Sequence, residues 1–329
     1  MKLGDAGELE VLERLRKRFT SSSEDVIVGI GDDAAALDIQ GHTLLISTDT
    51  MTEGIHFDLA LVTPYQIGFK LISSNVSDIF AMGGRPRWSL LNMTIPSDTE
   101  DGFFDNFLEG ISSGIKRYGL DLVGGDITGS RSSFTVSLTI SGMPEKRVIR
   151  RSGASAGDRV YLSGPVGEAS CGLELLKRLG RSVSLESGEE LRLSLKWESV
   201  EPVLKRFLLP EACGVSECLE YITSMIDISD GLFLDLTRLC RESSVGVRLY
   251  EEKIPVTEAL REVSAFLGKA PYGFITSGGE DYQQLFTSGK QLSMFTEIGE
   301  IMDRGLYIIR KDGSEEEIRP EGYQHFVFQ

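Results

Sequence analysis

The chain has 329 residues, among them 34 Lys or Arg, 50 Asp or Glu and 4 Cys, and its formal net charge at pH 7 is −16. Its length suits about two domains, and an apolar content of 41% with a charged content of 26% is ordinary for a soluble globular protein. The negative charge argues against a nucleic acid or a membrane as partner. The cysteines lack the CxxC spacing of a zinc site. No apolar run nears the ~20 residues of a membrane span, so we expect a cytoplasmic protein.

The chain begins with a predicted helix and two predicted strands. Apolar residues at helical spacing predict an amphipathic helix over Glu8–Phe19. The short apolar runs Val26–Ile30 and Leu44–Ile46 predict buried strands, and acidic residues follow each of them. These acids are Asp32 and Asp33 after the first run, and Asp49 in Ser47-Thr48-Asp49 after the second. Strand ends are where α/β proteins usually place their chemistry, so these residues are candidates for a site.

The acids stand close to glycines, which indicates a kind of ligand. A glycine-rich turn lets a ligand approach the backbone, as phosphate loops do, but carboxylates beside the turn would repel a phosphate. Asp32, Asp33 and Asp49 can lie near phosphates only if divalent cations lie between them, and Mg²⁺ binds in this way. The alternative is that Asp and Gly are common turn residues, and for Asp32-Asp33 alone the two interpretations weigh about equally. Repetition of the pattern along the chain favours the metal.

The pattern continues through the first half. A helix predicted from Pro64 to Met82 places Asn75 and Asp78, three residues apart, on one face. Their neighbours on that face are apolar, so these polar groups need partners. A short strand is predicted over Asp121–Gly125, and Asp126 follows it directly after two glycines.

In the second half, one basic position and two further junctions stand out. Arg151 is the best candidate within a basic cluster to face an anionic ligand. The segment 225–232 predicts a strand that ends in Asp227, Ser229 and Asp230, followed by a helix whose first N–H groups favour an anion. Asp230 could instead only cap that helix. Glu280 follows Gly278-Gly279 at a later junction.

Together these acids exceed what helix capping or a solvated surface requires. The chain has no GxxxxGK[ST] loop and lacks the motif set of protein kinases, which excludes the usual nucleotide-binding folds. Many acids with glycines suit a metal-bridged triphosphate, with phosphoryl transfer driven by positioning and by Mg²⁺.

The ordered motifs resemble those of the thiamine-monophosphate kinase family, in the superfamily of aminoimidazole ribonucleotide synthetase. They run over nearly the whole chain and comprise Gly29–Ala34, Ser47–Asp49, Glu53–Phe57, Asn75–Asp78, Gly124–Asp126, Arg151–Gly153, Asp227–Leu232, Ser277–Tyr282 and the tail Gly322–Phe326. The resemblance implies an α/β (α+β) fold of two domains. Residues 1–145 would bind ATP and Mg²⁺ and form a homodimer, in which the N-terminal sheets of two subunits pair into a barrel. Residues 146–329 would complete the nucleotide and substrate site.

The resemblance also implies the reaction and its residues. ATP phosphorylates thiamine monophosphate to the diphosphate with Mg²⁺, by direct in-line transfer without a covalent intermediate or an assigned general base. The implied metal ligands are Asp33, Ser47, Thr48, Asp49, Asp78, Asp126, Asp227 and Asp230. The implied nucleotide contacts are Gly125, Asp126, Arg151 and Ser229, and the implied substrate contacts are His56, Glu280 and Tyr323.

One departure from the family and two alternatives stay open. Ile127 follows Gly-Gly-Asp where the family usually has Thr, so a metal or nucleotide contact there is expected to be weaker or displaced. A superfamily relative could instead use ATP to activate another substrate. This chain has neither the N-terminal Cys of selenophosphate synthetases nor the Cys-bearing tail of hydrogenase-maturation relatives. The other alternative is a non-catalytic protein that binds a metal–nucleotide complex.

Overall fold

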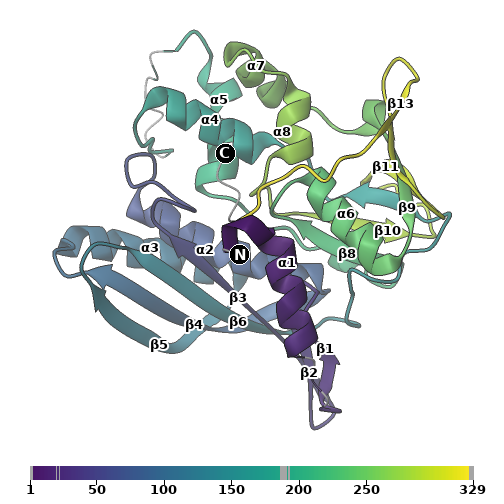
Figure 1. Ribbon diagram of the computed structural model, residues 1–329. Coiled ribbons are helices and arrows are strands. Elements are labelled where there is room, and N and C mark those ends of the chain that lie inside the picture. Colours follow the sequence, from purple (N-terminus) through teal and green to yellow (C-terminus); the bar gives the residue numbers. More distant parts are fainter. Residues whose placement is uncertain (1–2, 20, 22, 186–190, 192, 326–329) are drawn as a thin grey trace.

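The structure, a computed structural model, describes residues 3–19, 21, 23–185, 191 and 193–325. Two sheets, each covered by helices, lie side by side (Figure 1). The first has six strands in the order β1-β2-β3-β6-β4-β5, and the second has seven in the order β13-β12-β9-β11-β7-β10-β8. The expected mixed α/β fold of two units is therefore present. None of the helices in the described part of the chain combines the length and the apolar character of a membrane span.

The first unit comprises α1 (Leu3–Arg18), β1 (Val26–Val28), β2 (Ala35–Ile39), β3 (His42–Thr52), α2 (Pro64–Ala81), β4 (Gly84–Pro96), α3 (Asp101–Tyr118), β5 (Asp121–Ser130) and β6 (Thr135–Pro144). Helix α2 contacts α3 as well as β3, β4 and β6, and its other side contacts β8 and β10 of the second unit. It is therefore buried almost all round, as its largely apolar sequence indicates. Thr63 and Gln66 form a capping box that fixes where α2 begins.

Two acids of the first unit, Asp49 and Asp126, lie inside strands, not after them. β2 pairs with β3 only as far as Ile46, whereas β6 pairs with β3 from Leu45 to Thr52. The prediction of a strand ending at Ile46 was wrong, because the ladder to β6 sustains β3 through its polar residues. From Ser47 onward, β3 has lost its β2 neighbour, so this edge of the strand is free to line a site. In the same way, β5 continues past Asp126 to Ser130 because it pairs in parallel with β4 along its whole length.

The second unit comprises β7 (Arg159–Leu162), α4 (Glu168–Leu179), α5 (Trp197–Leu208), β8 (Ile222–Ile228), α6 (Leu232–Ser243), β9 (Gly246–Tyr250), α7 (Glu258–Phe266), α8 (Pro271–Ser277), β10 (Gln283–Ser288), β11 (Thr296–Met302), β12 (Leu306–Ile309) and β13 (Glu315–Glu317). As predicted, β8 ends and α6 begins around Asp227 and Asp230. Gly231 joins them with a φ of 127°, and a Cβ there would lie 2.9 Å from the backbone of Ser277. Only glycine allows the α8–β10 segment to approach so closely.

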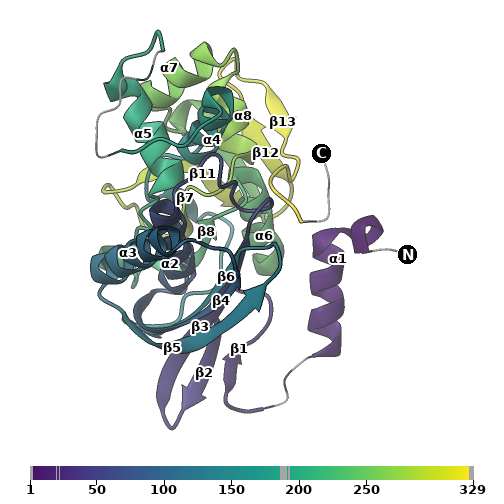
Figure 2. The same cartoon turned by 90° about the vertical axis from the view of Figure 1, so that its left-hand side faces the viewer.

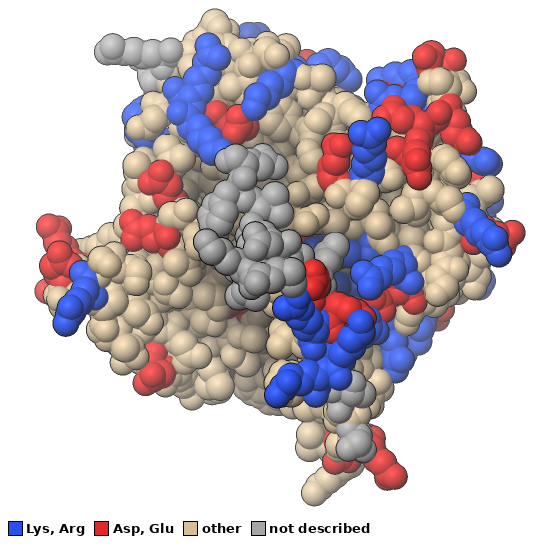
Figure 3. Space-filling view, in the orientation of Figure 1, with Lys and Arg blue, Asp and Glu red and all other residues tan. Residues whose placement is uncertain are grey.

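Both ends of the described chain meet beside α6. Helix α1 lies on the side of the molecule away from α2 and α3 (Figure 2) and pairs with α6 through Arg16 and Glu242, 3.0 Å apart. Charges of both signs gather over this region (Figure 3). The backbone N–H of His325 donates to Glu8 of α1 at 2.8 Å. The predicted Gly322–Phe326 tail is described only up to His325, since Phe326 lies outside the described residues.

Candidate active site

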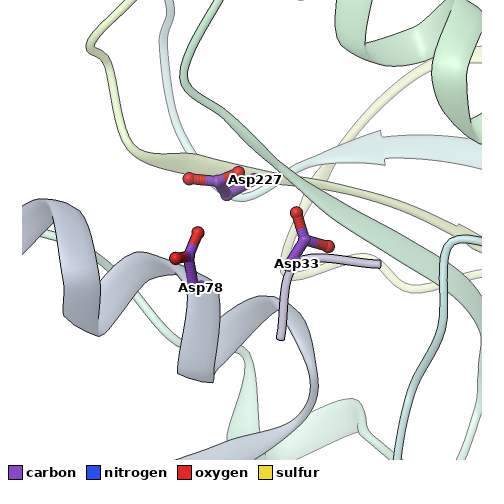
Figure 4. A group of neighbouring side chains, drawn as sticks. All are labelled: Asp33, Asp78 and Asp227. Carbon is purple, nitrogen blue, oxygen red and sulfur yellow. The ribbon is translucent and has the colours of Figure 1, made fainter. Parts of the chain in front are cut away.

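Three acids from distant parts of the chain meet between the two units. Asp33 lies in the loop before β2, Asp78 on α2 and Asp227 at the end of β8, and their side chains converge (Figure 4). One carboxylate oxygen from each lies within 4.8 Å of the others. Such a spacing suits shared coordination of a cation, because carboxylates this close repel one another unless positive charge lies between them.

The protein supplies part of that positive charge and several hydrogen bonds. Arg151 lies 2.6 Å from Asp33, Ser47 donates to Asp78 at 2.5 Å, and Ser77 donates to Asp227 at 2.8 Å. Even so, Asp33 Oδ2 and Arg151 Nε are buried without a hydrogen-bond partner among the described residues. Buried carboxylate oxygens normally have partners, so a free oxygen at this point fits a metal ligand.

Burial and mutual repulsion raise the pKa values of Asp49, Asp78 and Asp227. Burial, and to a smaller extent the charges of Asp49 and Asp227, hold the pKa of Asp78 well above its usual range. Burial, and to a smaller extent the charge of Asp33, likewise hold the pKa of Asp227 well above its usual range. Burial and the charge of Asp230 raise the pKa of Asp49 to about 6. A divalent cation would reverse these shifts, since it favours the ionised form.

A second arginine holds the acids at the start of α6. Arg238 pairs with Asp230 at 2.5 Å and with Asp235 at 2.8 Å. Asp235 is fully buried and also accepts from the backbone N–H groups of Asp230 and Gly231, at 3.0 and 3.1 Å. Asp235 therefore fixes the junction that carries Asp230. Asp230 caps no helix here, because the structure shows no side-chain cap at the start of α6.

Two cavities of different character open on these acids. The larger, of about 950 Å³, has Arg16, Arg151, Arg238 and Arg241 in its wall beside apolar residues such as Val28. The smaller, of about 440 Å³, has four aromatic side chains in its wall, those of His56, Tyr282, Tyr323 and His325. The residues common to both walls are Glu8, Thr48, Asp49, Asp78, Asp227, Ser229 and Asp230. The acids thus stand where the two cavities meet.

The predicted substrate contacts all line the smaller cavity. The Nδ1 atom of His56 accepts from the backbone N–H of Thr52 at 3.0 Å, so the ring proton is on Nε2. Burial and the neighbouring His325 lower the pKa of His56, which favours this neutral form. Tyr323 packs edge-on against His325, with ring centroids 5.1 Å apart. Glu280 lies in the segment between α8 and β10.

Gly125 and Asp126 are not brought to these acids within one chain. Asp126 is exposed on β5, the outer strand of its sheet. It pairs with Asn92, which pairs with Ser137, which pairs with Thr50 of β3. Three strand spacings separate β5 from β3, or roughly 14 Å at about 4.8 Å each. A single metal ion cannot bridge that distance.

Several residues of the site were not predicted from the sequence. Arg238 and Asp235 are three apart on α6, and this spacing next to Asp230 was a usable signal for a shared helix face. Lys70 carries no such signal, because its partner Glu280 lies 210 positions away. Arg16 on α1 lies in an ordinary amphipathic helix, where a basic residue gives no signal of a site.

Comparisons with known proteins agree with this geometry. The family model described as AIR synthase related protein, N-terminal domain, matches residues 31–143, and the corresponding C-terminal domain model matches residues 155–319. The thiamine-monophosphate kinase of Aquifex aeolicus (strain VF5) is 34% identical over 334 residues, covering 99% of this chain and 100% of that protein. The thiamine-monophosphate kinase of Escherichia coli (strain K12) is 33% identical, covering 98% of each.

A solved structure extends the likeness to three dimensions. It is described as AaThiL complexed with AMPPCP and TMP, and it superposes with a TM-score of 0.85 at 31% sequence identity. The match covers 99% of each chain, so both units and their relative placement are shared.

Proposed function

This chain belongs to the thiamine-monophosphate kinases of the AIR synthase related family, and we propose that it transfers the γ-phosphoryl group of ATP to the phosphate of thiamine monophosphate, forming thiamine diphosphate. The observation that carries the proposal is the junction of two unlike cavities at one group of acids. A kinase needs such a junction, because donor and acceptor phosphates must meet in line.

The larger cavity suits ATP. Its arginines provide charge for a triphosphate, and Arg151 also places a guanidinium beside Asp33, where metal and phosphate would meet. Its apolar wall, which includes Val28 and Leu37, suits a nucleobase. Ser229 lies in the wall common to both cavities and offers a hydroxyl close to the transferred group.

Mg²⁺ fits the residues at the junction. Asp33, Asp78 and Asp227 would hold it with Ser47, Thr48, Asp49 and Asp230 as neighbouring oxygen donors. Hard oxygen ligands and a free buried oxygen on Asp33 are what this cation requires. When bound, it supplies charge that offsets the repulsion between the acids and the phosphates.

The smaller cavity suits the substrate. Tyr323 offers an aromatic face to a cationic thiazolium ring, and Glu280 an acceptor to the aminopyrimidine. His56, neutral and protonated on Nε2, can donate one hydrogen bond. The acceptor phosphate is already an anion, so transfer needs no general base.

We also propose that two chains form a homodimer through the open face of the first sheet. Trp88 and Leu90 of β4 are exposed on that face, and the edge strand β5 exposes Leu122, Val123 and Ile127. Figure 3 shows few charges over this region. β5 is also an edge strand, and pairing with a second sheet would cover it. In such a dimer, Asp126 of one subunit would approach the acids of the other, which a single chain does not allow.

The test is ADP release by the purified protein with thiamine monophosphate, ATP and Mg²⁺. We expect turnover that stops when EDTA removes the metal. Absence of turnover while ATP binds would favour the alternatives, a relative with another substrate or a non-catalytic nucleotide-binding protein. Turnover that is undiminished in EDTA would contradict the metal assignment alone.

A further inference from the structure

A buried lysine lies behind the wall of the substrate cavity. Lys70 of α2 is 3% exposed, and its Nζ lies 3.1 Å from Glu280 Oε2 and 3.5 Å from the ring centroid of Phe207 on α5. The ion pair joins the two units, because α2 belongs to the first and Glu280 and Phe207 to the second. A lysine is almost never buried so completely unless its charge has a partner, so Lys70 depends on Glu280.

The backbone of Glu280 is held in an uncommon conformation. Its φ is 67°, in the left-handed region that side chains other than glycine seldom occupy. Its N–H donates to the carbonyl of Ser229 at 2.8 Å, and a Cβ on Gly279 would lie 2.3 Å from the same oxygen. The close approach to the end of β8 therefore imposes this conformation, which directs Glu280 to the cavity. Conformations of this kind persist only where surrounding contacts hold them.

The carboxylate of Glu280 has two oxygens with different surroundings. Oε2 accepts from Lys70, whereas Oε1 accepts no hydrogen bond from the described residues. The side chain is 29% exposed and forms part of the cavity wall with His56 and Tyr282. One oxygen is thus occupied by the protein, and the other is available to a ligand that donates an N–H.

We propose that Lys70 is a positioning residue that sets recognition of the substrate ring by holding Glu280 with Oε1 toward the cavity. The inference rests on the proposed function, since the exocyclic amino group of the aminopyrimidine is the donor that Oε1 would accept. Without Lys70, the carboxylate would turn freely, and the amino group would lose a fixed acceptor. Lys70 touches neither the metal-binding acids nor the larger cavity, so nucleotide binding should not depend on it.

The test compares Michaelis constants in Lys70→Met, which keeps the length and apolar stem of the side chain. We expect the KM for thiamine monophosphate to rise about tenfold or more, since a hydrogen bond to a charged group is disrupted. The KM for ATP should stay within about twofold, a change of less than 0.5 kcal/mol. Lys253→Met is the matched control: Lys253 also pairs with a glutamate, Glu297 at 2.8 Å, and lies over the Tyr250 ring, and it lines neither cavity.

A structural role and a positioning role predict different results. If Lys70 acts through Glu280, Lys70→Met should raise the KM for thiamine monophosphate in the wild type but not in a Glu280→Gln background. The wild type should also prefer thiamine monophosphate to the analogue without the amino group, and Lys70→Met should lose that preference. Equal rises in both KM values, or an undiminished effect in the Glu280→Gln background, would overturn the proposal.

Phe207→Leu provides a second variant if Lys70→Met does not fold. It removes the ring beneath the ammonium and should raise the KM for thiamine monophosphate severalfold, again with little change for ATP. An unchanged KM for thiamine monophosphate in the folded variant would overturn the proposal. A wild type that releases no ADP with thiamine monophosphate would overturn the proposed function itself, whereas an active wild type with unaffected variants would overturn the inference alone.

Discussion

Replacing Asp78 by Asn should stabilise the metal-free protein and almost abolish its activity. The carboxylate lies with Asp33 and Asp227 within 4.8 Å, and burial followed by the charges of Asp49 and Asp227 raises its pKa well above the usual range. The amide removes this cost and still accepts the hydrogen bond from Ser47. We expect the free energy of unfolding in EDTA to rise by roughly 1 kcal/mol. Turnover should fall by about 10²–10³-fold, the usual loss when one transition-state electrostatic contact is removed.

Two measurements are needed because the expected signs are opposite. Urea denaturation in EDTA gives the stability, and ADP release over a range of Mg²⁺ concentrations gives the turnover. Asp98→Asn, at an exposed position after β4 that lines neither cavity, removes the same charge and should change neither quantity. A variant of Asp78 with near-normal turnover at saturating Mg²⁺, or one that unfolds more easily in EDTA, would refute the reasoning.

Three further outcomes are expected. Tyr323→Ala should raise the KM for thiamine monophosphate by up to ~30-fold and leave the KM for ATP nearly unchanged, because an aromatic face over a cationic ring contributes roughly 0.5–2 kcal/mol. Equal changes of the two KM values in steady-state assays would assign the tail a structural role only. Ile127→Lys, at a side chain 65% exposed on β5, should convert a dimer to a monomer in sedimentation velocity, and a wild-type monomer would contradict the dimer. In EDTA, the melting temperature should fall as the pH rises from about 4 to about 7. Burial raises the pKa of Asp49 to about 6 and that of Asp235 to about 7. The folded state therefore binds more protons than the unfolded chain over this pH range, and loses stability as they are released. Mg²⁺ should lessen this fall, and a slope of the opposite sign would contradict the assigned shifts.

The features that the sequence predicts best are those that depend on the spacing of residues close together in the chain. The spacing of Asn75 and Asp78 predicted one helix face with buried partners, and the structure shows Asn75 accepting from the backbone of Asp49 at 3.1 Å and Asp78 accepting from Ser47. The junction at Asp227 and Asp230 also lies where a strand was predicted to end. These features depend on the local periods of helix and strand, which the order of residues expresses directly.

The lengths of the strands and the position of Asp126 could not be predicted correctly from the sequence. The polar run Ser47–Thr52 stays a strand because β6 pairs with it, and β5 extends because β4 pairs with it. Such pairing depends on a neighbouring strand that local composition does not specify. Asp126 was grouped with the other acids through the family resemblance, and its distance from them within one chain became apparent only from the strand order.

The sequence by itself determined the chemical type of the site: acids beside glycines, in an acidic chain without a known phosphate loop, require a cation before they can meet a phosphate. Only the tertiary structure decided which residues share that site. It placed two cavities on either side of one set of acids, set Arg238 against Asp230, and joined Lys70 to Glu280 from 210 positions away. The physical reason is that a buried charge becomes tolerable only beside its partner, and these partners approach one another only when the two units pack.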